Sequence, residues 1–150
     1  MSYYPVFLDL RHREVLVVGA GNVALRKVRG LIEAGAIVTV VSPEVSAGFE
    51  QLPVTMRKRR FRPSDIASQA LVFTATNDRK TNHRVASLAT QKRIPVNVAD
   101  APQECTFIVP ARVNHKDVQI AISTGGRSPR LAKSLREKLE RLLSGGGMIP

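Results

Sequence analysis

The stretch from Val15 to Gly35, VLVVGAGNVALRKVRGLIEAG, contains residues whose types and spacing suit phosphate binding. Gly19, Gly21 and Ala24 form a G-x-G-x-x-A pattern between an apolar run and an amphipathic segment. In such a pattern the first glycine allows a tight turn, and the second lets the backbone approach a pyrophosphate. The N-terminus of the following helix then faces the anion. The pattern predicts a dinucleotide-binding turn, and the alternative is a tight turn that holds no cofactor.

The next apolar run ends in VVSPE, where dinucleotide-binding folds place an acidic residue that bonds the ribose. Ser42 occupies the tip of this run and Glu44 comes two residues later. Glu44 either bonds the ribose hydroxyls or stabilises the N-terminus of a following helix, and the sequence leaves both readings open. No arginine directly follows the tip to receive a 2′-phosphate, so NAD is favoured over NADP.

Two further polar stretches follow predicted strands. Thr76 and Asn77 come straight after one strand, at the edge where open α/β sheets bind ligands. Asn77 or Asp78 can equally cap the next helix, and the two roles are compatible. Asp100 follows a later strand, where a carboxylate can accept a proton from a substrate within hydrogen-bond reach. The alternative for Asp100 is an Asx-type turn before Pro102.

The stretch STGGRSPRLAK predicts a helix that starts with Ser128 as N-cap and Pro129 at the first helical position. The same loop is a second candidate site for a carboxylate or phosphate. The residues available there are Gly125, Gly126, Arg127, Ser128 and Arg130.

The elements that must position these residues alternate along the chain. Short runs rich in Val, Ile and Phe predict strands at 15–18, 37–41, 54–61, 70–74 and 94–98. Helical patterns lie between them at 23–34 and 79–91, with brief helical turns at 43–51 and 64–68. This alternation predicts an α/β fold with a Rossmann-type parallel sheet.

The pattern changes after DAPQEC. Strands are predicted at 106–109 and 118–123, with the turn-forming stretch PARVNHKD between them as a hairpin. A final helix from Pro129 to Leu143 carries a stripe of leucines, which must be covered by the sheet or by a second copy of the chain. The tail SGGGMIP is expected to fray.

Composition narrows the possible partners. A chain of 150 residues, 43% of them apolar, is long enough for one principal core. Its net charge of +11 favours a polyanion such as nucleic acid, an acidic membrane surface or a polycarboxylate ligand. The basic run MRKRRFRP is expected on an edge strand, and few aromatic residues are available to stack on bases.

One cysteine and three scattered histidines give no metal-ligand spacing, so no metal site is expected. The sequence has neither a secretory signal pattern nor a long apolar run. We therefore expect a soluble, cytoplasmic protein with no membrane partner. Because few aromatic residues are available to stack on bases, no nucleic-acid partner is expected either.

Several segments together resemble the precorrin-2 dehydrogenase family, also found as the N-terminal domain of siroheme synthases. The likeness runs from about Pro5 to Leu143. It rests on the segments PVFLDLRHREVLVVGAGNVALRKVRGLIEAGA, ATNDRKTNHRVA, PVNVADAPQECTFIVPA and ISTGGRSPRLAKSLREKLE.

The resemblance implies oxidation of precorrin-2, an octacarboxylate, to sirohydrochlorin with NAD, and in some members insertion of ferrous iron. Asp100 matches the catalytic aspartate, taken to be a general base. Ser128 matches a serine near the tetrapyrrole. The positions that match cofactor contacts are Asn22, Val23, Pro43 and Glu44.

The family also implies a homodimer. Residues 1–105 would form the NAD-binding domain, and residues 106–150 would form the dimerisation region with its hairpin and helix. Members usually continue into a further helical segment that helps to form the tetrapyrrole cleft, whereas this sequence ends at SGGGMIP, so chelation is left open. Two alternatives remain: a regulatory domain that senses NAD(H) without turnover, and a nucleic-acid-binding module suggested only by the charge.

Overall fold

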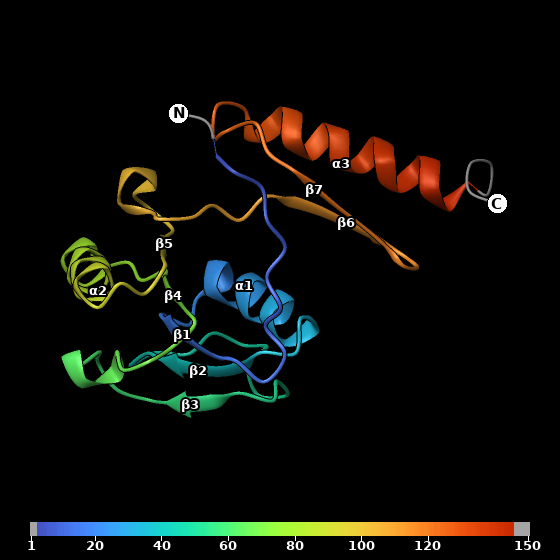
Figure 1. Ribbon diagram of the computed structural model, residues 1–150. Coiled ribbons are helices and arrows are strands. Elements are labelled where there is room, and N and C mark those ends of the chain that lie inside the picture. Colours follow the sequence, from blue (N-terminus) through green and yellow to red (C-terminus); the bar gives the residue numbers. More distant parts are fainter. Residues whose placement is uncertain (1–2, 146–150) are drawn as a thin grey trace. The chain divides into compact units, whose positions relative to one another are not determined.

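The computed structural model describes residues 3–145 of the chain, and these divide into two compact units (Figure 1). The first unit is Phe7–Ile108. The second contains residues 109–145 together with residues 3–6. The frayed tail expected from the sequence extends into residues 146–150, which lie outside the described part.

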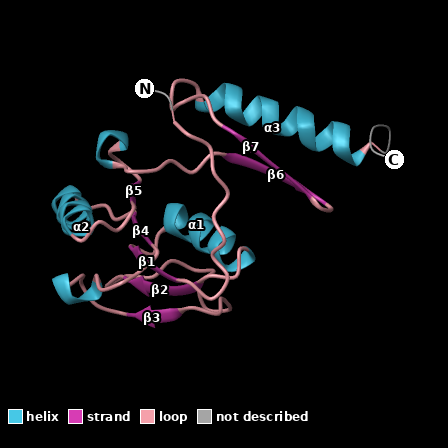
Figure 2. Cartoon of the chain, in the orientation of Figure 1, coloured by secondary structure: helices cyan, strands magenta, loops and turns pink. Residues whose placement is uncertain are grey.

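The first unit is an α/β fold with five parallel strands in the order β3-β2-β1-β4-β5. Two long helices connect neighbouring parts of the sheet, as the colouring by secondary structure shows (Figure 2). The Rossmann-type parallel sheet expected from the sequence is therefore confirmed. The elements are β1 Glu14–Val18, α1 Asn22–Glu33, β2 Ile37–Val41, β3 Thr55–Arg57, β4 Leu71–Thr74, α2 Arg79–Gln91 and β5 Val96–Val98.

Both faces of the sheet are covered because the strands are apolar on both sides. Val15 and Val17 of β1 pack in one cluster with the buried face of α1. Leu16 and Val18, which point the other way, pack in a second cluster with the buried face of α2. This arrangement holds all five strand ends in one rigid layer.

The basic run beyond β2 differs in part from the sequence expectation. β3 is an edge strand, as expected, but it ends at Arg57, and a 3₁₀ turn follows at Pro63–Asp65. The strand is short because the chain folds back on Asp65, whose side chain is only 1% exposed. Its carboxylate accepts hydrogen bonds from Arg57 Nη1 at 2.9 Å, from Arg59 Nη2 at 2.5 Å and from the Arg62 backbone N–H at 2.8 Å.

The second unit contains an antiparallel hairpin, β6 Ala111–His115 with β7 Val118–Ile122, and the helix α3 Pro129–Ser144. The strand expected at 106–109 is wrong. Thr106 instead lies beside β5, where its backbone N–H donates to Val96 O and its hydroxyl accepts from Val96 N–H. The Thr106 hydroxyl takes the place of a backbone carbonyl as the acceptor for Val96 N–H, so residues 106–109 form no strand ladder with β5.

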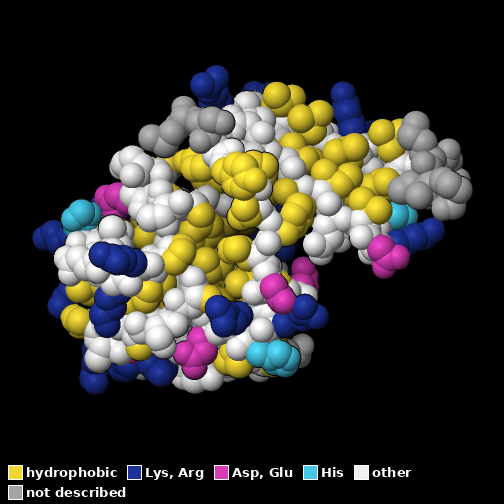
Figure 3. Space-filling model, viewed as in Figure 1, with side chains coloured by type: hydrophobic (Ala, Val, Ile, Leu, Met, Phe, Trp, Pro, Cys, Tyr) yellow, Lys and Arg dark blue, Asp and Glu magenta, His cyan; other side chains and the backbone are white. Residues whose placement is uncertain are grey.

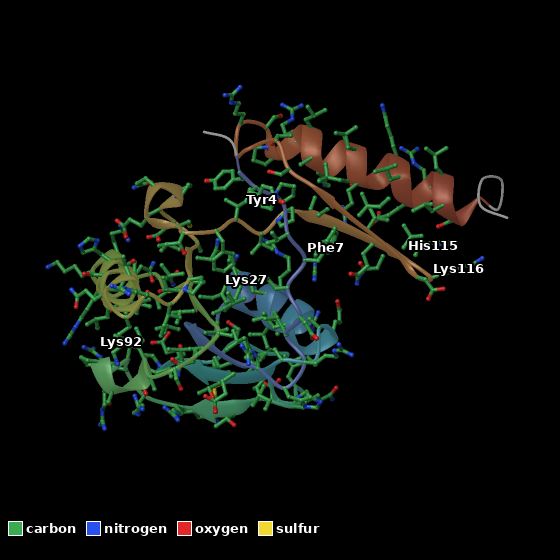
Figure 4. The ribbon with its side chains drawn as sticks, viewed as in Figure 1. Tyr4, Phe7, Lys27, Lys92, His115 and Lys116 are labelled. Atoms are coloured by element: carbon green, nitrogen blue, oxygen red, sulfur yellow. The ribbon has the colours of Figure 1, made fainter. Side chains whose placement is uncertain are left out.

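The turn of the hairpin is also shorter than expected. Asn114 pairs with Gln119 inside the ladder, and only Lys116 and Asp117 form the turn. Lys116 has a positive φ of 50°. Figure 4 shows His115 and Lys116 at the tip of the hairpin.

Asp65→Ala should destabilise the protein by about 3 kcal/mol, the lower end of the range for a broken buried ion pair, because the arginines keep contact with water. The arginine bonds, led by that of Arg59, lower the pKa of Asp65 to about 2. The stabilisation is therefore full above the ordinary carboxylate pKa, near 4, and is lost as the pH falls through about 2. Chemical denaturation of both proteins between pH 7 and pH 2 measures the difference.

The matched control is Asp9→Ala, which removes the exposed ion pair between Asp9 and Arg11. This control should change stability little, because exposed ion pairs are screened by water. Equal losses of stability in the two variants would show that the Asp65 cluster stabilises the fold no more than an exposed ion pair does. A loss of stability in Asp65→Ala that does not shrink in acid would show that the ionised carboxylate is not its cause.

Candidate active site

The turn between β1 and α1 has the geometry of a phosphate cradle. Gly19 has a φ of +105°, and its N–H donates to Val41 O at 2.9 Å. A Cβ on Gly19 would lie 2.4 Å from Ala75 O, so only glycine fits between the ends of β2 and β4. A Cβ on Gly21, by contrast, would meet nothing within 4 Å. The first glycine makes the turn possible, and the second leaves open space in front of it.

The N-terminus of α1 faces this open space without a competing group. Gly21 is the N-cap, and no side chain caps the helix. The first turn, which begins with Asn22 and Val23, contains no acidic residue. Backbone N–H groups and the positive end of the helix dipole are therefore available to an anion.

The loop after β2 lies next to the cradle. Ser46 N–H donates to Ala20 O at 2.9 Å, and the Ser42 hydroxyl donates to Glu44 O at 2.6 Å. Pro43 and Glu44 are exposed, and no helix forms over residues 43–51. The helix-stabilising alternative for Glu44 is therefore wrong, because its side chain follows a strand end and enters an irregular loop. Binding of a ribose by Glu44 stays a prediction.

The end of β2 also lies beside Arg57 of β3, which the sequence analysis did not connect with this loop. Ser42 N–H donates to Arg57 O at 3.2 Å, which brings the end of β3 to the tip of β2. The guanidinium of Arg57 is already paired with Asp65. The backbone of this arginine is thus near the tip, and its side chain pairs with Asp65, a carboxylate that it shares with Arg59.

Thr76 and Asn77 lie in the loop after β4, at the same sheet edge as Gly19. Asp78 caps α2 by accepting from Lys80 N–H at 3.0 Å, so the capping role belongs to Asp78. Thr76 is held by Asn82, which the sequence analysis missed. The Asn82 side-chain oxygen accepts from the hydroxyls of Thr74 and Thr76, each at 2.7 Å.

Asn82 is fully buried on the same face of α2 as Val85, Ala86 and Ala89. A polar residue in the middle of an apolar stripe is the signal that would have found it, because buried amides need several hydrogen-bond partners. Its bonds fix the loop that follows β4.

Asp100 lies just beyond β5, where Ala99 N–H donates to Thr74 O at 3.0 Å. This bond places Asp100 at the carboxyl edge of the sheet, next to the end of β4. The carboxylate is 39% exposed, and its Oδ1 lies 3.8 Å from Nη1 of Arg79. The carboxylate is therefore accessible at this edge, and its role as a general base stays a prediction.

A second polar group missed by the sequence analysis lies beneath this edge. Lys27 of α1, which is labelled in Figure 4, donates to the side-chain oxygen of Asn97 in β5 at 2.9 Å. Its Nζ also lies over the Phe73 ring, 5.4 Å from the ring centre. Asn97 in turn donates to Phe107 O at 3.1 Å. Burial lowers the pKa of Lys27. These bonds join the cofactor-side helix to the strand that leads to Asp100.

The second candidate anion site lies in the second unit, between β7 and α3. Gly125 and Gly126 have φ values of +63° and +80°, and neither would meet a neighbour through a Cβ within 4 Å. Ser128 caps α3 by accepting from Leu131 N–H at 3.2 Å. The capping role is confirmed, whereas binding of a carboxylate or phosphate at this turn stays a prediction.

Residues 3–145 contain neither a cluster of metal-ligating side chains nor a helix that could span a membrane. No three or more His, Cys, Asp or Glu side chains gather there in a way that would hold a metal ion. In the same residues, no helix combines the length and the apolar character needed to cross a membrane.

The parallel sheet, the open glycine turn and the uncapped helix together define a dinucleotide-binding protein of the Rossmann type. A family model described as "Putative NAD(P)-binding" matches residues 6–111, and one described as "Sirohaem biosynthesis protein central" matches residues 116–142. A solved structure of SirC, a precorrin-2 dehydrogenase, matches with a TM-score of 0.79 and 32% identity, over 95% of this chain and 74% of that one. The chain belongs to the precorrin-2 dehydrogenase family.

Curated relatives agree with this assignment. The chain is 43% identical over 148 residues to the siroheme synthase of Nitrosomonas eutropha and 44% identical over 147 residues to that of Thioalkalivibrio sulfidiphilus. Each alignment covers 95% of this chain but only 31% and 30% of the relative. The chain thus spans about a third of the length of these relatives. The matches support a nicotinamide dinucleotide as the cofactor.

Gly21→Asp should leave the protein folded, because its side chain enters open space, but should weaken NAD binding by at least about a hundredfold. The new carboxylate would occupy the place of the pyrophosphate and repel it. Calorimetric titration with NAD and a thermal melt measure the two effects.

The matched variant Gly19→Ala should instead lower the melting temperature, because its Cβ would collide with Ala75 O at a positive φ. Undiminished NAD affinity in Gly21→Asp would remove this turn from the cofactor site.

Proposed function

We propose that this chain oxidises precorrin-2 to sirohydrochlorin with NAD, as a step of siroheme synthesis. The observation that carries the proposal is the meeting of the open glycine turn and Asp100 at one edge of the sheet. The likeness to SirC over 95% of the chain supports the same reaction. Insertion of ferrous iron is not included in the proposal.

The first unit supplies the cofactor site. The β1–α1 turn, with Gly19, Gly21, Asn22 and Val23, would bind the pyrophosphate through backbone N–H groups. The nicotinamide, when bound, supplies the chemistry of hydride acceptance. The loops after β4 and β5 lie at the same edge of the sheet. Thr76 and Asn77, in the loop after β4, would contact the cofactor there.

NAD rather than NADP is supported by the loops after β2 and β3. Glu44 is exposed two residues beyond the strand tip and can accept hydrogen bonds from ribose hydroxyls. Its negative charge would repel a 2′-phosphate. The nearby guanidinium of Arg57 forms an ion pair with Asp65 at 2.9 Å, which holds this side chain in the β3 loop.

Asp100 would act as the general base. The oxidation removes a hydride equivalent and a proton from the macrocycle, and the hydride leaves to the cofactor. Asp100, which is partly exposed, would take the proton and pass it to water. Precorrin-2 carries eight carboxylates, so a net charge of +11 suits it as a substrate. Gly125, Gly126 and Ser128 would bind one of these carboxylates.

We also propose that the chain forms a homodimer. Among residues 109–145, Val113 is the one buried hydrophobic side chain, and no residue of α3 is buried. Leu131, Leu135 and Leu142 are 51%, 38% and 57% exposed along one side of α3. Figure 3 shows hydrophobic side chains gathered over the hairpin and α3. A hairpin and a helix with so little buried surface need a partner, and a second copy would bury this face.

Asp100→Asn should lower the rate of precorrin-2 oxidation by roughly a hundred- to ten-thousand-fold with NAD affinity unchanged, because the amide keeps the shape but cannot accept the proton. Anaerobic turnover and a separate NAD titration measure the two quantities. The control is Asp9→Asn, which changes a carboxylate that precedes β1, at the other edge of the sheet.

A parent rate in Asp100→Asn would show that another group, such as His115, or water takes the proton. Tight NAD binding without any oxidation of precorrin-2 by the parent protein would instead favour a domain that senses NAD(H).

Changing both Leu131 and Leu135 to Lys should raise the dimer dissociation constant by at least about a hundredfold, since each buried leucine contributes about 1.5 kcal/mol or more. Sedimentation velocity over a dilution series measures the shift. Glu140→Gln combined with Ser144→Lys makes the same change of charge on the opposite side of the helix and should leave the dimer intact. An unchanged dimer in the leucine variant would remove this face of α3 from the interface.

A further inference from the structure

Arg79 joins two carboxylates that follow β5. Its Nη1 lies 3.8 Å from Asp100 Oδ1, and its Nη2 forms an ion pair with Glu104 Oε1. Glu104 ends the 3₁₀ turn Pro102–Glu104, only four residues beyond Asp100. The guanidinium therefore spans the loop that carries the proposed base and links the two ends of that loop.

The dipole of α2 repels a cation at the position of Arg79, and the nearby carboxylates offset this repulsion. Arg79 is the first residue of α2, whose first turn contains no acidic residue. A cation at a helix N-terminus is repelled by the helix dipole. Asp78 fixes this turn by capping it, and also accepts from the Thr81 hydroxyl at 2.6 Å. The backbone of Arg79 is thus held in place, and its side chain reaches across to the β5 loop.

Glu104 is the anchor of this contact. Its carboxylate is 22% exposed and also lies 3.3 Å from Nδ1 of His83, one turn further along α2. Its Oε2 is buried and has no hydrogen-bond partner among the described residues. A carboxylate desolvated to this degree binds a guanidinium more strongly than an exposed one does. Glu104 therefore restricts Arg79, and Arg79 can then restrict Asp100.

We propose that Arg79 is a positioning residue for Asp100, which orients the catalytic carboxylate at the sheet edge while Glu104 holds Arg79. This inference rests on the proposed function, in which Asp100 is the base. The Arg79 guanidinium limits the directions in which the Asp100 carboxylate can point, and a base acts only within hydrogen-bond reach of the proton that it accepts. Its planar fork contacts Asp100 and Glu104 together, which a lysine ammonium does less well.

The experiment compares Arg79→Gln and Arg79→Lys with Arg84→Gln, an exposed arginine of the same helix, in the anaerobic precorrin-2 assay. Arg79→Gln should lower kcat by about ten- to a hundredfold, the cost of a misplaced catalytic group, with the KM for NAD unchanged. Arg79→Lys should restore part of this loss because it keeps the charge. Arg84→Gln should match the parent, and thermal melts should be alike for all three.

A double-mutant cycle separates positioning from a merely structural role. In an Asp100→Asn protein, Arg79→Gln should cause no further loss of kcat, because the group that it positions no longer acts as a base. The same loss in both backgrounds, or a kcat for Arg79→Gln equal to that of Arg84→Gln, would overturn the inference while leaving Asp100 as the base. A parent rate for Asp100→Asn alone would overturn the proposed base and this inference together.

Discussion

The close approach of three backbone segments at Gly19 is the constraint on which the candidate site depends. The Gly19 N–H bonds to the end of β2, and its Cα lies so near Ala75 O, at the end of β4, that a side chain cannot fit. The first turn of α1 is thereby placed at the carboxyl edge of the sheet, between two strand tips. An anion at that turn lies in the crevice where open parallel sheets bind ligands.

Polar side chains inside the first unit hold the loops around this edge. Asn82 bonds the end of β4 and the loop beyond it, while Lys27 and Asn97 join α1 to β5. Such groups are costly to bury, and each is stabilised by satisfied hydrogen bonds. A buried hydrogen bond has one favoured geometry, whereas apolar contacts tolerate shifts. The loop that carries Asp100 is accordingly held from its own strand, from β4 and from the Arg79 side chain.

The two units differ in how completely each buries its apolar residues. The first unit has clusters on both faces of its sheet. The second has one buried hydrophobic side chain in its hairpin and helix, and Leu131, Leu135 and Leu142 remain exposed. The first unit alone contains the cofactor turn and Asp100, whereas Ser128 and its glycines belong to the second. Under the proposed function, the cofactor site would therefore be built by a self-sufficient fold and the substrate site by a part that depends on assembly.

Periodicity and glycine spacing in the sequence were sufficient to predict the parallel sheet, its two main helices, the glycine turn and the position of Asp100 at the sheet edge. All of these features follow from local patterns. The bounds of β2 and α2 agree with their predicted ranges. The tertiary structure alone decided contacts between particular side chains of different elements and loops: Asp65 with its arginines, Thr106 beside β5, Asn82 beneath Thr76, and Arg79 beside Asp100. It also showed that no helix follows β2 and that the hairpin begins at Ala111. The local propensity of a residue does not say which side chain of another element it will contact. Charge pairing and burial are determined only once the strands are packed side by side.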